Sequence, residues 1–267
     1  MGWRTEAERS DQNMNKTTDD TQLAEDFGRY FEMVPATNPS LCEQAYRIRY
    51  AVYAAELGWE DRASFPAGIE TDEFDSDSVS CLLRHRSLGR AVGCVRLVLS
   101  AQNATRPFPF ENAAASAGTP FVTTSLDSGW RRHAAEISRV AVVAEFRRRR
   151  HERNQPHEVP EEEPTLAAER RVFPHIAIGL YLGAAALGMR RGLEQVFAIM
   201  EPKLARRLRI YGILFDEVGP PIEHHGLRVP YCLRRENFVK NMAPPIRVLF
   251  EAIDNELGVA LAKAAAP

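Results

Sequence analysis

The chain has 267 residues, 45% of them hydrophobic and 26% charged, and its 34 basic and 36 acidic side chains give a formal net charge of −2. A disordered chain would have fewer apolar residues and a larger net charge, and a collagenous one would show a repeat that this sequence lacks. The near-neutral charge gives nucleic acid no global attraction, and the length suits one core of about 150 to 250 residues. These values predict a globular protein with one large domain or two small ones.

The N-terminal residues 1–22 are rich in charge, and Trp3 is their only aromatic residue. We expect a disordered tail, followed by a single domain over residues 23–267. The tail has neither the basic start nor the apolar centre of a signal peptide, which favours a cytoplasmic protein. The four cysteines lie too far apart for a zinc knuckle or a CxxC pair, so reduced thiols are expected.

The segment from Phe173 to Met189 contains no Asp, Glu, Lys or Arg and invites comparison with a membrane helix. It includes Pro174 and is shorter than the roughly 20 apolar residues that cross a bilayer. Gly179 and Gly183 form a GxxxG pair, which is typical of close helix packing. We therefore expect a buried helix that packs closely on a sheet.

The first half of the domain begins with a predicted helix. Ser40 followed by Glu43 is typical of a capping box, so the helix is expected to start at Leu41, and its apolar pattern fades at Leu57. Two strands are then predicted over residues 79–83 and 91–99, paired as a hairpin.

Polar residues interrupt the predicted strands at two points. On the second strand of the hairpin, Arg96 projects from an otherwise apolar face. A third strand is predicted over residues 135–143, with Glu136 and Arg139 on opposite faces. Glu136 is expected to share its face with Ser138, Val140 and Val142.

The second half alternates between helices and strands after a charged stretch at about 147–165, which we expect to be a flexible insertion. A long helix follows, in which Pro174 is expected to produce a kink. The predicted elements are a helix over 166–191, a strand over 195–200, a helix over 202–211, and strands over 213–218 and 229–233. Together with the first-half hairpin they predict an α/β fold, a mixed central sheet flanked by helices in one domain.

Three features stand apart from this scaffold: an acidic loop from Glu70 to Asp75, Arg96 and Glu136. The loop alone is typical of a solvated turn and has too few spaced ligands for a metal site. Arg96 needs a charged partner, because an unpaired buried charge costs several kcal/mol. Together the three predict one buried polar cluster, either a structural ion-pair network or an active site.

Residues 41–143 resemble the acyl-homoserine-lactone synthases, a branch of the GNAT-fold acyltransferases. These enzymes share an arginine and an aromatic on the first helix, a tryptophan, an acidic loop, a G-x-x-R-L strand and an E-x-S-R strand, in this order. The matching residues are Arg49, Tyr53, Trp59, Asp72, Asp75, Gly93, Arg96, Leu97, Phe108 or Phe110, Glu136, Ser138 and Arg139.

The C-terminal half departs from the synthases. Its segments 197–202, 204–208 and 225–231 look more like the acyltransferases associated with PEP-CTERM/exosortase systems, which are similar to N-acyl amino acid synthases. Over the full chain this resemblance implies a GNAT N-acyltransferase and leaves its product undefined.

The resemblance implies transfer of a fatty acyl group from a thioester, on acyl carrier protein or coenzyme A, to the amine of an amino-acid-like acceptor. Glu136 is expected to be the base that takes the proton of the amine, with Asp72 as the second choice. Arg96, paired with Asp72 or Asp75, would hold the acidic loop over the acceptor.

Other residues are expected to bind the acceptor. Arg49 and Arg139 would bind its carboxylate or fix the acidic loop. Trp59, Phe108 and Phe110 would wall its pocket. The remaining residues of this group are Tyr53 and Ser138.

The acyl donor is expected beside the third strand, where a backbone amide near Val140 to Val142 would face the oxyanion. Ordinary GNAT enzymes follow this strand with a glycine-rich turn that holds the pyrophosphate of coenzyme A. This chain has an arginine run there instead, which either docks an acidic carrier protein or forms an arm neutralised by nearby glutamates. The run consists of Arg147, Arg148, Arg149 and Arg150.

Several alternatives remain open. They are a homoserine-lactone synthase that uses S-adenosylmethionine, a short-chain acetyltransferase, and a catalytically silent carrier-binding module. No metal, permanently bound cofactor, nucleic acid or membrane span is expected, and His224 and His225 are assigned a structural role. A Ser/His/Asp hydrolase is disfavoured, because the chain has no G-x-S-x-G elbow.

Overall fold

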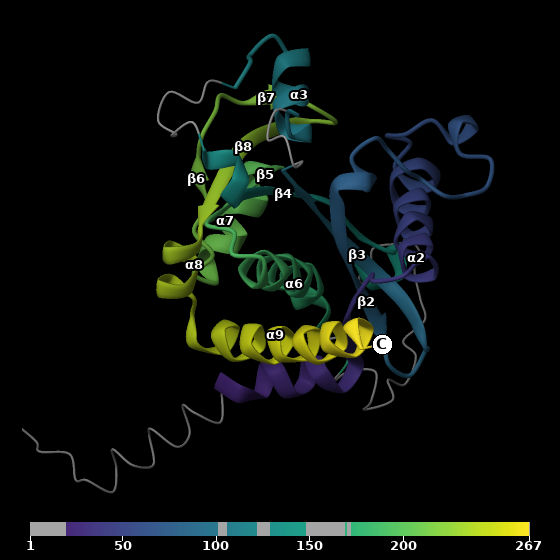
Figure 1. Ribbon diagram of the computed structural model, residues 1–267, viewed down its shortest axis with the longest axis vertical. Coiled ribbons are helices and arrows are strands. Elements are labelled where there is room, and N and C mark those ends of the chain that lie inside the picture. Colours follow the sequence, from purple (N-terminus) through teal and green to yellow (C-terminus); the bar gives the residue numbers. More distant parts are fainter. Residues whose placement is uncertain (1–19, 101–105, 122–128, 148–168, 170–171, 267) are drawn as a thin grey trace, which may run out of the picture.

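A mixed sheet runs through the computed structural model, which describes residues 20–100, 106–121, 129–147, 169 and 172–266. In these residues eight strands follow the order β1-β2-β3-β4-β5-β8-β6, with β7 paired to β8 (Figure 1). Neighbours are antiparallel, except that β4 and β5 are parallel. The strands are β1 Phe31–Pro35, β2 Ser78–His85, β3 Arg90–Leu99, β4 Ala134–Val142, β5 Gln195–Met200, β6 Asp216–Glu217, β7 Ile222–Glu223 and β8 Leu227–Arg234. The predicted α/β fold is confirmed.

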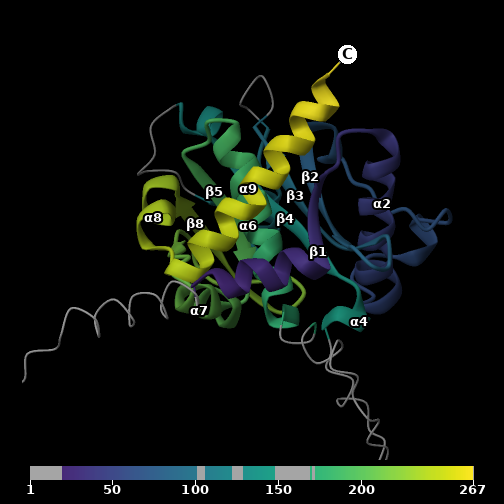
Figure 2. The same ribbon diagram turned by 90° about the horizontal axis from the view of Figure 1, so that it is seen from below.

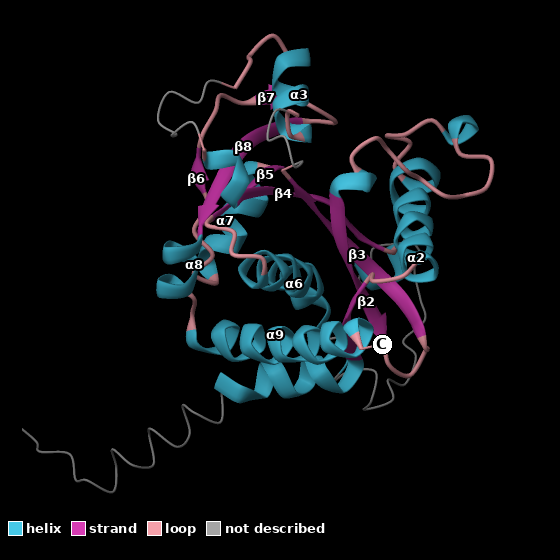
Figure 3. Cartoon of the chain, viewed as in Figure 1, coloured by secondary structure: helices cyan, strands magenta, loops and turns pink. Residues whose placement is uncertain are grey.

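Helices cover both faces of this sheet (Figure 3). One of them, α2, lies on one face of β2 and β3, and α6 lies on the other face. The last helix, α9, packs on α6 and on β1 (Figure 2). The described helices are residues 20–30, α2 Pro39–Arg49 with a π-helical continuation Tyr50–Glu56, α3 Pro109–Ser116, α4 Ala144–Arg147, α6 Ile176–Arg190, α7 Pro202–Ile210, α8 Arg235–Asn241 and α9 Pro244–Ala265.

Several predicted boundaries were wrong. The cap of α2 is Asn38, whose Oδ1 accepts from Leu41 N at 3.0 Å, so the helix starts before the predicted Ser40 cap. Residues 20–22 are helical rather than part of a tail. The helix expected over 166–191 becomes α6 only at Ile176, after a 3₁₀ turn that contains Pro174. The tail residues 1–19 and most of the expected insertion lie outside the described residues.

The predicted close packing of α6 is confirmed. A Cβ on Gly179 would lie 2.5 Å from the ring of Phe27, and one on Gly183 would lie 3.1 Å from Met33. Both glycines therefore let α6 approach the N-terminal helix and β1. Among the described residues, none of the helices has the length and apolar character that a bilayer crossing requires.

A β-bulge in β4 alters the predicted faces of that strand. Cys94 pairs with Ala141 and Arg96 pairs with Ser138, so two residues of β4 lie opposite one residue of β3. The first bulge residue, Arg139, has φ +49°. Because the extra residue shifts the alternation by one, the side chains after the bulge lie on the face opposite to the predicted one.

The strands β4 and β5 separate soon after they meet. They pair only from Ala134 to Glu136, opposite Gln195 to Phe197, although both strands continue. Glu136 therefore lies at the last paired position, where the parallel strands diverge. The candidate site is built around this point.

Candidate active site

Two buried arginines hold the acidic loop. Arg49 is 1% exposed and forms ion pairs with Glu70 and, at 2.6 Å, with Asp75. Arg96 is 2% exposed, and its Nη1 lies 2.5 Å from Asp72 and 2.9 Å from Asp75. The predicted cluster of loop carboxylates and Arg96 is thus confirmed, and Arg49 is buried beside it.

The bulge brings a third arginine to the same loop. The Nη2 of Arg139 lies 2.8 Å from Glu60, 3.2 Å from Glu70 and 3.4 Å from Asp72. Both Arg139 and Arg96 therefore reach Asp72, and the prediction that Arg139 points away from the side of Glu136 was wrong. The reason is the extra residue in β4, which period-two alternation does not include.

The bulge also moves Val140 and Val142. Ala141, on the face of Cys94, packs under α2, whereas Val142 joins the large core beneath α6 and Val140 packs against that core. The expectation that the two valines share the face of Glu136 was therefore wrong. The backbone of Val140 still contributes, since its carbonyl accepts from the hydroxyl of Tyr53 at 2.9 Å.

Burial and hydrogen bonds act in opposite directions on the two candidate bases. Burial raises the pKa of Glu136 to about 8, although the amide of Phe110 and the charge of Arg96 oppose it. Burial would also raise the pKa of Asp72, but the hydrogen bond and charge of Arg96 outweigh it and lower this pKa. Glu136 is 1% exposed. Of the two, Glu136 has the pKa suited to proton transfer near neutral pH.

Ser138 orients Arg96 rather than facing solvent. Its Oγ accepts from Nε of Arg96 at 3.0 Å. Each edge of this guanidinium is thus fixed, by Ser138 on one side and by loop carboxylates on the other. Arg96 is therefore a rigid link between β3, β4 and the acidic loop.

An aromatic cluster lies beside Glu136. Phe110, which donates its amide to Glu136 at 2.8 Å, stacks on Phe197 with centroids 5.0 Å apart. Phe108 stacks on both rings and is 2% exposed. The structure thus brings Phe108 and Phe110 to the predicted base, together with Phe197, which the sequence analysis did not select.

Trp59 belongs to a different aromatic group. Its ring stacks on Tyr53 at 5.7 Å and on His225 at 4.9 Å, and it is 37% exposed. Arg228 lies 5.6 Å from the same ring. The C-terminal half therefore reaches the predicted acceptor residues through the β7–β8 hairpin, where sequence reasoning assigned the histidines only a structural role.

Of the predicted donor-binding arginines, Arg147 lies in the described residues. Its Nε donates to the carbonyl of Val142 at 2.6 Å, and its guanidinium forms an ion pair with Glu56. These contacts fix the end of β4. They also occupy part of the guanidinium of Arg147, which was predicted to bind the donor. Arg148, Arg149 and Arg150 lie outside the described residues.

Four contributing residues were missed: Glu60, Phe197, His225 and Arg228. Glu60 directly follows Trp59, so the tryptophan could have drawn attention to it. Arg228 lies among buried, mostly apolar residues of β8, the same signal that singled out Arg96. Contact of His225 with Trp59 has no local sequence signal, since it joins residues far apart in the chain.

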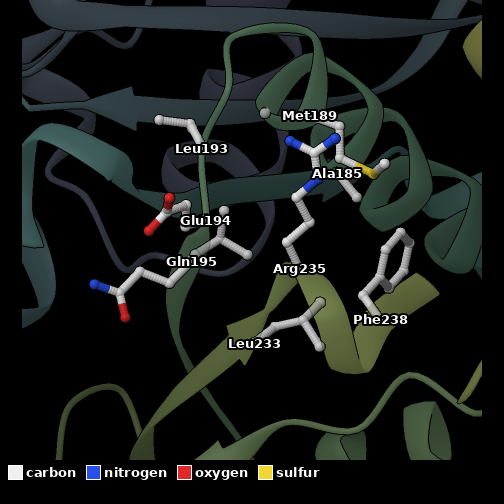
Figure 4. Close-up of a pocket in the computed structure, with 10 residues that line it drawn as sticks. Ala185, Met189, Leu193, Glu194, Gln195, Leu233, Arg235 and Phe238 are labelled. Carbon is white, nitrogen blue, oxygen red and sulfur yellow. The ribbon is translucent and has the colours of Figure 1, made fainter. Parts of the chain in front are cut away.

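A separate pocket lies where α6 ends and β5 begins (Figure 4). Its lining includes one carboxylate, Glu194, and one guanidinium, that of Arg235, which lies beside Ala185 and Met189. It shares no lining residue with the cluster around Glu136. In the described part of the chain, no group of three or more potential metal ligands occurs.

Comparisons with known proteins agree with this fold. The family model "Acetyltransferase (GNAT) domain" matches residues 48–154, which contain the acidic loop, Arg96 and Glu136. An acyl-homoserine-lactone synthase of Agrobacterium fabrum is 39% identical over 59 residues, which are 22% of this chain and 27% of that protein. The chain is thus matched to little more than a quarter of that relative's length.

Solved structures extend the likeness over most of the chain. A CoA-dependent acyl-homoserine lactone synthase, MesI, has a TM-score of 0.52 and 21% identity, and covers 84% of this chain and 94% of its own. TofI in an apo form has a TM-score of 0.51 and 19% identity, and covers 80% of this chain and 99% of its own. The class is therefore defined by the fold: the chain has the GNAT fold, and its residues 48–154 match the GNAT domain model.

Proposed function

We propose that this chain is a cytoplasmic N-acyltransferase that moves a fatty acyl group from a thioester to the amine of an amino-acid-like acceptor. The observation that most favours this proposal is Glu136, a buried carboxylic acid with a pKa of about 8 where β4 and β5 diverge. An amine acceptor must lose a proton before it attacks, and a base whose pKa lies near the working pH is best suited to take it.

In the proposed reaction, the neutral amine nitrogen attacks the thioester carbonyl carbon and a tetrahedral oxyanion forms. Collapse of this intermediate breaks the carbon–sulfur bond and forms the amide. Glu136, directly or through a water, receives the proton that converts the ammonium form of the acceptor to the neutral amine. The second proton, which the nitrogen loses after attack, passes to the leaving sulfur and gives a free thiol. A backbone amide of the separated strand β4 would stabilise the oxyanion.

The remaining residues position these groups. Arg96, Arg49 and Arg139 hold the acidic loop against the sheet through ion pairs. Asp72 is the loop carboxylate that both Arg96 and Arg139 reach, and its side chain is 23% exposed. We propose that Asp72 attracts the ammonium form of the acceptor before Glu136 deprotonates it.

Acyl carrier protein is the proposed donor. A basic surface supports this proposal, since exposed Lys203, Arg206, Arg207 and Arg209 follow one another along α7. Glu201, the residue before α7, bonds Arg228 beside Trp59, so this surface adjoins the site. An acidic carrier would be drawn to it by charge. Coenzyme A thioesters are the second candidate.

A homoserine-lactone synthase is the second candidate function. It is favoured by the 59-residue match to the Agrobacterium fabrum enzyme. The association with PEP-CTERM/exosortase systems stays a prediction from the C-terminal segments. Mass spectrometry of the product separates the two functions, because a lactone would form only with S-adenosylmethionine.

Purified protein supplied with acyl thioesters and a panel of amines tests the proposal. We expect amine-dependent release of thiol, measured with a thiol reagent, and an N-acylated product. The variant Glu136→Gln should lose this release while remaining folded. A well-folded protein that releases no thiol with acyl carrier or coenzyme A donors would contradict an enzymatic function and favour a carrier-binding module.

A further inference from the structure

Arg228 on β8 is a buried cation with one exposed ion-pair partner. It is 9% exposed, and its Nη1 donates to Glu201 at 3.0 Å. The Glu201 side chain is 56% exposed, so water competes for this contact. A buried guanidinium held by one solvated carboxylate can exchange it for an anion from a ligand.

The surroundings of Arg228 are aromatic and open to solvent. Its guanidinium lies over the Trp59 ring, and that ring also stacks on His225. His225 has φ +53° and precedes Gly226 with φ +94°, so two successive left-handed residues turn the hairpin tip toward Trp59. The β7–β8 hairpin thus brings charged and aromatic side chains to Trp59, which was predicted to wall the acceptor pocket.

His224 lies within the electric field of two arginines. Partial desolvation lowers its pKa, and the positive charges of His225, Arg139 and Arg228 lower it further. Arg139 and Arg228 therefore approach the hairpin tip from opposite halves of the chain. Arg139 also lies over Tyr53, whose ring stacks on Trp59.

The arginines of the N-terminal half are already neutralised. Arg49 and Arg96 are buried in ion pairs with Glu70, Asp72 and Asp75. Arg139 faces three carboxylates, which leaves it little attraction for a further anion. Arg228 differs, because one exposed carboxylate is its ion-pair partner in the described residues.

We infer that Arg228, with Trp59 and the His224-His225 tip, forms the subsite that binds the carboxylate of the acceptor. This inference rests on the proposed function. It assigns a binding site to the carboxylate of the acceptor, which Glu136 does not contact. The ammonium end would face Asp72 and Glu136, and the carboxylate end would replace Glu201 on Arg228. Acceptors with a free carboxylate are then preferred over their neutral carboxamides.

The experiment compares acids with amides that carry the same amine. The probes are L-amino acids and their carboxamides, with S-adenosylmethionine and its decarboxylated form as a further pair. Thiol release gives kcat/KM for each pair, and calorimetry without donor gives binding. We expect the wild type to prefer the acid by on the order of tenfold or more, as for a hydrogen-bonded charge pair.

Substitutions at Arg228 and at Glu201 should move this preference in opposite directions. Arg228→Gln should abolish it by raising KM for acids and leaving amides unchanged, and Arg228→Lys should restore part of it. Glu201→Gln removes the competing carboxylate at an exposed position and should increase the preference. The Glu201→Gln variant still tests the subsite if Arg228→Gln does not fold.

The matched controls are Arg234→Gln and Asp216→Asn, an exposed ion pair 3.3 Å apart that joins the end of β8 to β6. Both should leave the preference unchanged. An equal response of acids and amides to Arg228→Gln, or an unchanged preference in Glu201→Gln, would overturn the subsite. Acid-selective binding that responds to both variants without thiol release would retain the subsite and contradict the proposed function. Binding of neither acids nor amides would overturn the subsite.

Discussion

The backbone amide of Phe110 donates a 2.8 Å hydrogen bond to Oε2 of Glu136. Phe110 is the second residue of α3, where helical amides have no partner within the helix. The bond therefore satisfies a helix amide and favours the ionised carboxylate, while burial favours the neutral acid. The resulting pKa of about 8 leaves Glu136 able to change its charge near neutral pH.

The first prediction concerns the pH dependence of turnover. If Glu136 is the base, it must be ionised before it accepts a proton, so kcat/KM should rise with pH and level off above about 8. Glu136→Gln keeps an acceptor for the Phe110 amide but should lower kcat by at least about a hundredfold. Glu256→Gln is the control, since Glu256 also accepts a backbone amide, that of Met33, outside the site. A wild-type rate in folded Glu136→Gln would remove Glu136 as the base.

The second prediction concerns stability. The folded pKa of Glu136 lies above its unfolded value, so the folded state holds this proton more tightly. Its contribution to stability should be complete below pH 4.5 and should be lost as the pH rises toward about 8. Urea unfolding at several pH values measures this loss, which is on the order of a few kcal/mol. Glu136→Gln should show a flatter profile over that range, and an unchanged slope would contradict the assignment.

The third prediction concerns the loop arginines. Arg96→Ala would leave Asp72 and Asp75 without this buried partner and should lower the free energy of unfolding by about 3–5 kcal/mol. Turnover should fall with it, because the acidic loop loses its anchor. Arg84→Gln, which breaks a partly exposed pair with Glu32, should cost at most about 1 kcal/mol. Similar losses in the two variants would show that the cluster adds little stability.

The fourth prediction separates the charge of Arg139 from its backbone. Arg139→Gly removes the ion pairs but keeps easy access to φ +49°, whereas Arg139→Val removes them and strains the bulge. The free energy of unfolding of Arg139→Val should therefore be lower than that of Arg139→Gly by about 1–2 kcal/mol. Denaturant unfolding of both variants measures the difference. Equal stability would show that the bulge does not require the left-handed conformation.

The fifth prediction concerns the donor. Reversing the charges of Lys203, Arg206 and Arg207 on α7 should raise KM for an acyl carrier protein thioester by on the order of tenfold. KM for the coenzyme A thioester should not change, since the basic face is proposed to contact the carrier alone. Lys263→Glu on α9 reverses one charge outside this surface and should leave both KM values unchanged. Loss of activity with both donors would instead indicate damage to the fold.

Sequence patterns predicted the parts of the fold that follow simple periods. The β2–β3 hairpin and the location of β4 came from alternation, and the buried α6 from its lack of charge. The missed α9 has apolar residues such as Ile246, Leu249 and Ile253 at helical spacing after two prolines, so its signal was available. Only five residues form β1, which is too short for a clear period.

The site was predicted in its residues more than in its geometry. The acidic loop, Arg96 and Glu136 were expected to form one cluster, and ion pairs join the loop to Arg96. The bulge at Arg139 was not predicted, because one inserted residue moves side chains between faces without a change in composition. Contacts such as Trp59 with His225 depend on tertiary packing, which a local pattern does not contain.

The edge strand β1 is held in part by α9. The amide of Met33 in β1 donates to Glu256 in α9 at 2.7 Å, across a separation of 223 residues. During synthesis, β1 therefore presents an uncovered edge and an open donor until α9 has been made, and open strand edges promote pairing between chains. Chains that lack α9, whether nascent or shortened, should consequently associate through β1.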